Sequence, residues 1–284
     1  MPEVEADGHI RHMLQSLHRF KSQHEQLQRF GRVGVKAKTQ LGVDDDETGP
    51  LLMSHSIFQA VNLAADCALA AHRLCIDGER LVLHQYAHYA LARSGIEGAA
   101  QGLWLLAPDD RHERVRRLLG VRSTEVQKDQ SLYRSMTKVR PSDTAKERRD
   151  KDRGRNELNG RIKKHKAWID SVAKRHGIDS EQIEVSSTFA MVEFATSLTG
   201  VKAEHGSATW VVLSGLVHPS ATRSNQFSQN KEMGEPREGI VSVEVTADHR
   251  TSMIAFASLE TLLARALDLL AKRMLAPERS GAES

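Results

Sequence analysis

The chain has 284 residues and a formal net charge of +3, with 39% hydrophobic, 27% charged and 5% aromatic residues. This composition is that of an ordinary soluble globular protein, and it excludes collagen-like, disulfide-scaffold and wholly disordered classes. The length is sufficient for one large domain or two small ones to bury a core. Because no motif has a unique chemical meaning, function must be argued from architecture, charge and a few polar residues in apolar surroundings.

The N-terminus, residues 1–7, is acidic and lacks the basic and apolar regions of a secretory signal. One of the two longest stretches without a charge, residues 205–222, contains glycines and a proline that disfavour a lipid-spanning helix, so we expect no membrane partner. Cys67 and Cys75 fall on one expected helix, roughly 12 Å apart, which is too far for a disulfide. We therefore expect reduced core thiols and a cytoplasmic protein.

The first 76 residues are expected to contain two helices joined by a loop. Residues 10–30 carry a thin apolar stripe typical of a polar surface helix. The acidic run 44–47 followed by Gly49-Pro50 predicts a solvated loop over residues 35–50. Ser54 or Ser56 is expected to cap the next helix, which continues to about Ile76 and is closed by Asp77-Gly78.

A longer helical pattern covers residues 80–107 and stops at Pro108. It is rich in glycine, alanine and serine, and small residues at this density predict close approach between helices in a bundle. Asp109 or Asp110 is expected to start another helix, and the helical pattern resumes from Thr124 to about Met136.

The composition changes sharply between residues 134 and 175, where 15 Lys and Arg stand against six Asp and Glu. This segment carries +9, so the rest of the chain carries −6. Apolar residues are sparse until Ile162, which predicts an exposed linker or helix that packs against the protein only at its end.

The remaining segments are again mainly helical. Helices are expected at residues 187–198, 208–217 and 251–274, whereas the polar stretch 222–239 is expected to be a mobile loop. Residues 240–245 alternate with period two, which indicates a strand, although no partner strand is obvious.

Together these patterns predict an all-α helical bundle with a basic arm or insertion and at most one short strand or hairpin. Residues 1–50 form an N-terminal helix and acidic loop, and residues 51–133 and 176–275 form the principal bundle. Residues 134–175 form the basic arm, and residues 276–284 form a disordered tail.

Two charges lie in the otherwise uncharged stretch between Leu81 and Ala107, namely Arg93 and Glu97. A helix this apolar should be buried, so we expect the two to form a core ion pair, since an unpaired buried charge is costly. The alternative is that Arg93 points into a polar pocket that binds an anion. His84 and His88 have a spacing that suits one metal ion, but no further ligand lies nearby in sequence, so neither a metal nor another cofactor is expected.

Ser214 and His218 lie four residues apart at the end of an apolar helix. Ser214 lacks the strand-turn-helix context of a catalytic serine. We favour a capping role for His218, whose positive form suits a helix C-terminus, over a catalytic role.

Two groups of basic residues could together bind phosphates, one in the helix after Pro108 and one in the basic arm. Only Tyr133 and Trp168 are available to stack on bases, which argues against sequence-specific reading of single strands, and the alternative is a solvated charged surface. The expected nucleic-acid contacts are Arg111, Arg114, Arg117, Arg148, Arg149, Arg153, Arg155, Arg161, Lys163 and Lys164.

The segments 89–97, 104–106 and 213–218 resemble those of uncharacterised bacterial helical proteins distantly similar to the HEPN superfamily. Some HEPN-like proteins are metal-independent ribonucleases of toxin or phage-defence systems, and others keep only the helical scaffold. The resemblance implies that a polar site would use Arg93, Glu97 and His218.

Three functions follow as expectations. The first is a HEPN-like protein that binds RNA, DNA or another polyanion through its basic arm and arginine-rich helix. The second is a ribonuclease in which His218 acts as acid or base and Arg93 steadies the phosphorane. The third is an interaction scaffold that forms a homo-oligomer through its helix faces.

Overall fold

The computed structural model describes residues 3–183, 185–218, 220–237 and 240–275. Within these ranges the chain is mainly α-helical, with two small antiparallel two-stranded sheets. The all-α prediction is therefore confirmed. The expected disordered tail, residues 276–284, lies outside the described residues.

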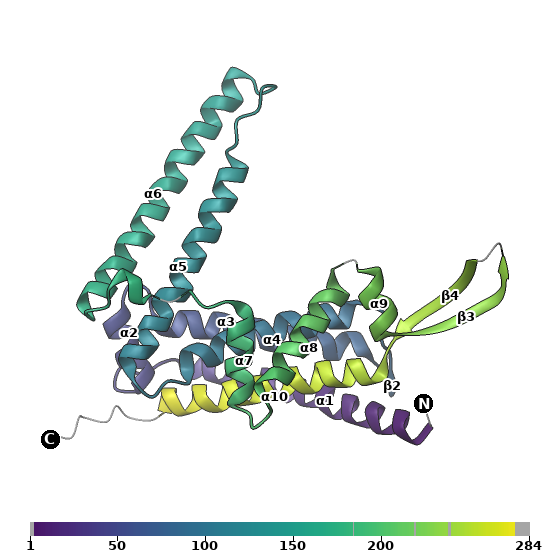
Figure 1. Ribbon diagram of the computed structural model, residues 1–284. Coiled ribbons are helices and arrows are strands. Elements are labelled where there is room, and N and C mark those ends of the chain that lie inside the picture. Colours follow the sequence, from purple (N-terminus) through teal and green to yellow (C-terminus); the bar gives the residue numbers. More distant parts are fainter. Residues whose placement is uncertain (1–2, 184, 219, 238–239, 276–284) are drawn as a thin grey trace.

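Four long helices form the bundle: α1 (Glu3–Val33), α3 (Met53–Cys75), α4 (Ala87–Leu106) and α10 (His249–Leu275). Helix α4 packs against both α3 and α10, and α1 covers the opposite side of these two helices (Figure 1). Fully buried side chains from each helix meet in the core, for example Phe20 and Phe256, whose rings pack edge to face with centroids 6.1 Å apart. Two shorter helices, α7 (Thr188–Ser197) and α8 (Ala203–Val217), cover the other face of α4.

Close approach of another helix to the small residues of α4 was expected, and it occurs between α4 and α3. A Cβ atom added at Gly98 would lie 2.6 Å from the carbonyl oxygen of Ala60, so only glycine fits there. Both expected thiols, Cys67 and Cys75, are buried and unbridged.

The long helix expected from residue 80 begins only at Ala87. Residues before it form a tight hairpin of β1 (Ile76–Asp77) and β2 (Arg80–Leu81), in which Gly78 has a φ of +60°. The glycine permits this turn, which reverses the chain directly after α3.

The acidic stretch expected to be a solvated loop is instead a helix, α2 (Gln40–Thr48). The side chain of Thr39 caps it by accepting a hydrogen bond from the amide of Gly42. Asp44 is 1% exposed and forms two hydrogen bonds with Arg114. The loop prediction was wrong because the partner that neutralises this aspartate lies 70 residues further along the chain.

The segment expected to be a mobile loop, residues 222–239, contains α9 (Ala221–Phe227) and strand β3 (Ser228–Arg237). Strand β3 pairs with β4 (Ile240–Ala247), which is the strand predicted from period-two alternation. The two form a ribbon that projects from one end of the bundle (Figure 1).

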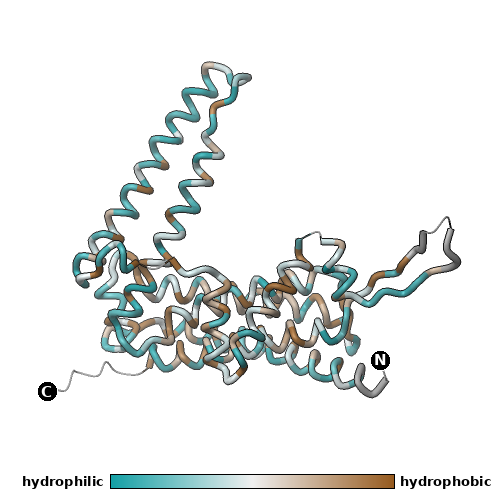
Figure 2. Tube along the Cα trace, in the orientation of Figure 1, coloured by the Kyte–Doolittle hydropathy of each residue, from teal (hydrophilic) through white to brown (hydrophobic). Residues whose placement is uncertain are grey.

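The basic segment forms α6 (Ala145–Arg175), which lies antiparallel to α5 (Arg111–Met136). The two helices project from the bundle as a long hairpin, which we call the arm (Figure 1). Most of its residues are hydrophilic, whereas hydrophobic residues are more frequent along the helices of the bundle (Figure 2). The buried residues of α6 are Ile162, Ile169, Val172 and Ala173, so the expectation of packing only toward its end is confirmed.

Candidate nucleic-acid interface

Local sequence explains why α6 is a helix despite its high charge. Thr144 and Glu147 form a capping box at its start, in which each side chain accepts a hydrogen bond from the other residue's backbone amide. Lys174 and Arg175 occupy its last turn, where positive charge is favourable. The helix therefore extends beyond the part that packs against the bundle.

The outer face of α6, opposite α5, carries positive charge without negative charge. At 3.6 residues per turn, roughly a third of the helix circumference holds eleven exposed residues, six of them cationic and none acidic. The six are Lys146, Arg149, Arg153, Lys163, Lys164 and Lys174. They span about 42 Å at 1.5 Å per residue. We call this surface the outer basic face.

Four of the predicted phosphate contacts belong to this face: Arg149, Arg153, Lys163 and Lys164. Three others, Arg148, Arg155 and Arg161, are exposed on other sides of α6. Arg148 donates to the carbonyl of Pro141, and Arg155 donates to the carbonyl of Thr137.

Arg114 was expected at the phosphate-binding surface, and this prediction was wrong. Its side chain is 3% exposed, pairs with Asp44 and donates to the carbonyl oxygens of Pro108 and Asp109. Arg111 is half-buried, and its Nε lies 3.4 Å from the same Asp44 carboxylate. The two arginines thus serve to fix α5 against α2.

Arg117 is also directed into the protein rather than toward solvent. Its guanidinium lies 3.8 Å from the ring centre of Trp104 and 4.4 Å from that of Phe194, and it pairs with Glu113. Hydrogen bonds from Arg116 and then from Arg117 lower the pKa of Glu113 to about 2. The arginine-rich start of α5 is therefore structural, and the charge available to a ligand lies on α6.

Aromatic side chains do not form a base-stacking platform on the outer basic face. Trp168 is half-buried, and the ammonium of Lys164 lies 4.9 Å from its ring centre. Tyr133 is half-buried on α5. A surface with cations and without stacking rings suits contacts with phosphates rather than with bases.

Arg93 and Glu97 form the predicted ion pair, with the two side chains 2.9 Å apart, but the pair is 23% and 30% exposed and therefore does not lie in the core as expected. Arg93 Nε also donates to Ser214 on α8, and Trp210 Nε1 donates to the same Glu97 oxygen. The arginine is thus held by partners on both α4 and α8.

His218 follows the last residue of α8 and is exposed. Its backbone amide donates to the carbonyl of Ser214, which places it at the C-cap, as predicted. The structure thus brings Arg93 next to Ser214, one helical turn before His218. No hydrogen bond or ion pair of the His218 ring occurs among the described residues.

The other histidine pair does not form a metal site in the described part of the chain, where three or more ligating side chains do not come together. His88 is fully buried, and its Nε2 lies 2.9 Å from the hydroxyl of Ser252, which also bonds Tyr89. Desolvation lowers the pKa of His88 to about 4, so the ring is neutral near pH 7.

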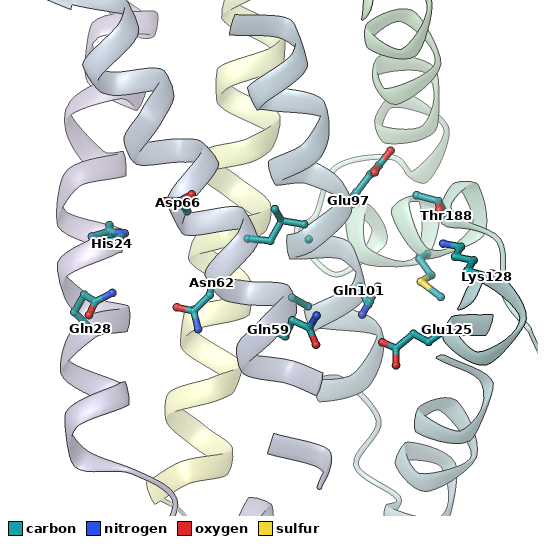
Figure 3. A pocket seen from close by; sticks show the side chains of 14 residues that line it. His24, Gln28, Gln59, Asn62, Asp66, Glu97, Gln101, Glu125, Lys128 and Thr188 are labelled. Atoms are coloured by element: carbon teal, nitrogen blue, oxygen red, sulfur yellow. The ribbon is translucent and has the colours of Figure 1, made fainter. Parts of the chain in front are cut away.

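An open groove of about 730 Å³ runs between α1, α3, α4, α5 and α7 (Figure 3). Four carboxamides line it, from Gln28, Gln59, Asn62 and Gln101, beside the carboxylates of Asp66, Glu97 and Glu125. Lys128 is the one lysine among the lining residues. The carboxylates disfavour a phosphate ligand, so this groove does not extend the outer basic face. Sequence analysis missed it, although Gln59, Asn62 and Asp66 share one face of a predicted helix.

Comparisons with known proteins leave the family open. Neither a family model, nor a curated protein sequence, nor a solved structure matches the chain. The resemblance to the HEPN superfamily therefore stays a prediction. Among the described helices, none is long and apolar enough to cross a membrane.

Proposed function

We propose that the arm binds the phosphate backbone of nucleic acid through the outer basic face. The single observation that carries this proposal is the set of six exposed cations on one side of α6, with no acid among them. Like charges on one face repel one another, and a bound polyanion removes that repulsion while releasing its own counterions.

The shape of the arm supports the same conclusion. The cations span about 42 Å, which exceeds one turn of duplex DNA at about 34 Å. Because the arm projects from the bundle, its outer face is open to a long ligand (Figure 1). The lack of stacking rings favours binding that depends little on base sequence.

Reversing charge on the outer basic face tests this function. We expect the triple variant Arg149→Glu, Arg153→Glu, Lys163→Glu to bind a 24-base-pair duplex about tenfold or more weakly than the unmodified protein at low salt. Fluorescence anisotropy with labelled DNA and RNA duplexes measures this directly.

A matched control has the same change in net charge on α1. The variant Arg11→Glu, Lys21→Glu, Arg32→Glu alters three exposed residues outside the arm. It should retain most of the affinity. Equal loss in both triple variants would show that only net charge matters, and the arm would not be the binding surface.

Ribonuclease activity is the second candidate, favoured by the contact between Arg93 and Ser214, one turn before His218. In this alternative His218→Ala abolishes RNA cleavage and leaves the melting temperature nearly unchanged. A purified protein that cleaves RNA equally well with and without His218 would contradict it.

A further inference from the structure

The seam between α5 and α6 changes chemistry along the arm. Near the bundle its buried residues are apolar, namely Val126 from α5 and Ile162, Ile169 and Val172 from α6. Beyond Ile162, toward the tip, an open cavity of about 440 Å³ lies between the two helices. This cavity lies on the side of α6 that faces α5, opposite the outer basic face.

Hydrogen-bond donors line the cavity. Helix α5 contributes Gln130, Tyr133, Arg134 and Thr137, and α6 contributes Arg155 and Asn159. None of the lining residues is an acid. Two guanidinium groups, a phenol and two carboxamides therefore share one space without a carboxylate.

The two arginines are incompletely neutralised by the protein. Arg155 donates to the carbonyl of Thr137 at 2.8 Å, and its other nitrogen lies 3.3 Å from Asp152, whose carboxylate is 59% exposed. Such an exposed pair contributes little. In the described part of the chain Arg134 forms no ion pair.

Packing alone does not account for this composition. Apolar side chains occupy the buried positions of the same seam closer to the bundle, whereas Arg134 and Arg155 are exposed and contribute little to packing. An anion between the guanidinium groups would compensate both charges, and arginine suits phosphate because its planar fork donates two parallel hydrogen bonds.

We propose that this cavity binds the phosphate group of a phosphomonoester. Its volume falls in the range of small-molecule sites, so the cavity has room for part of the group that carries the phosphate. The phosphate source is either a free mononucleotide or the terminal phosphate of a nucleic-acid strand. This site goes beyond the proposed function, because none of its lining residues belongs to the outer basic face.

Isothermal titration calorimetry with AMP and with adenosine tests the proposal for a free ligand. A pair of 12-nucleotide strands, with and without a 5′-phosphate, tests it for a strand end. We expect saturable binding that requires the phosphate. Loss of one guanidinium contact in Arg134→Met or Arg155→Met should weaken that binding by roughly tenfold or more, since charge-assisted hydrogen bonds are strong.

Two controls test whether the cavity itself binds the phosphate. Arg140→Met removes an exposed guanidinium in the connection between α5 and α6, outside both the cavity and the outer basic face, and it should leave the phosphate-dependent binding unchanged. Circular dichroism checks that each variant keeps its helix content, which is expected because Arg134 and Arg155 are exposed.

Each outcome of these binding experiments either supports or overturns the proposal. Binding of AMP that is lost in both cavity variants supports a free ligand, and binding only of the 5′-phosphorylated strand supports a strand end. The proposal is overturned if neither phosphorylated probe binds saturably, or if Arg134→Met and Arg155→Met bind as the unmodified protein does.

Discussion

Asp44 shows how a single residue determines whether a surface sequence becomes a core element. Its carboxylate receives two hydrogen bonds from Arg114, and both side chains are almost completely buried. Arg273, which is also buried, donates to Asp109 and to the carbonyl oxygens of Leu106 and Pro108 in the same region. These contacts join α2, α5 and α10 at one end of the bundle.

Asp44→Ala should therefore lower the free energy of unfolding by about 3–5 kcal/mol, because Arg114 would be left as an unpaired buried charge. Urea denaturation followed by circular dichroism measures the change. Asp46 lies two residues away and is exposed, so Asp46→Ala should cost no more than about 0.5 kcal/mol. Similar values for both variants would contradict a buried ion pair.

Gly98 is required for a steric reason, because a side chain at this position has no space. A methyl group there would meet the backbone of α3, at the Ala60 carbonyl oxygen and the Ala64 nitrogen, and backbone cannot move aside easily. We expect Gly98→Ala to destabilise the protein by about 1–3 kcal/mol, despite the better helix propensity of alanine. Thermal melts measure this change. Gly160→Ala on α6 has open space around its Cβ and should be neutral or slightly stabilising in the same measurement.

His88 should make stability depend on pH. Burial lowers its pKa from 6.5 to about 4, so the unfolded chain takes up a proton on this ring at a higher pH than the folded protein does. The stability that the neutral ring contributes is fully present above pH 6.5 and is lost as the pH falls toward 4. The loss is on the order of 3 kcal/mol.

Urea midpoints between pH 7 and 4 test this dependence. His88→Gln should flatten the profile in that window. An unchanged slope in His88→Gln would contradict the assignment.

At the scale of elements, the helix caps are the clearest link between sequence and structure. Thr144 and Glu147 start α6 in the part of the arm that is distant from the bundle, so the cap has little tertiary packing to support it. Thr144→Ala should cost about 1 kcal/mol locally. Hydrogen exchange should then accelerate at the first turn of α6 but not in α4, and equal acceleration in both helices would show that the arm unfolds with the bundle.

The elements predicted correctly are those with strong local signals. Apolar spacing indicated α1, α3, α7, α8 and α10, and Asp110 caps α5 as expected, accepting hydrogen bonds from the amides of His112 and Glu113. The errors arose where long-range contacts decide. Helix α2 depends on Arg114, and the polar strand β3 is a strand because β4 pairs with it.

The candidate site was also predicted only in part, because local patterns locate the basic residues but not the long-range contacts that bury some of them. The +9 segment located α6, and helical periodicity assigns Arg149, Arg153, Lys163 and Lys164 to one face. The sequence did not reveal that Arg114 is buried and that Arg117 packs against aromatic rings, because their partners, Asp44, Trp104 and Phe194, come from other elements. The seam cavity requires the pairing of α5 with α6, which no local pattern specifies.

At the scale of the whole molecule, the residues that stabilise the fold and the residues that carry the excess positive charge lie in different parts of the structure. The apolar core lies in the bundle and the buried pair of Asp44 with Arg114 lies at its end, whereas the arm holds the excess positive charge on a surface that does little for packing. A protein with a net charge of only +3 thus has a strongly basic extension on a bundle that is acidic overall. This asymmetry favours an orientation in which a polyanion contacts the arm and is kept away from the bundle.

The most direct test of the central claim is the salt dependence of binding to a 24-base-pair DNA duplex, measured between 50 and 200 mM salt. We predict a linear fall of log K with log salt whose slope is close to −5 for the unmodified protein, since each of six phosphate contacts contributes about −0.9. The slope should be smaller in magnitude by about 3 in the Arg149→Glu, Arg153→Glu, Lys163→Glu variant. No measurable binding at 50 mM salt, or identical slopes for the two proteins, would contradict the account.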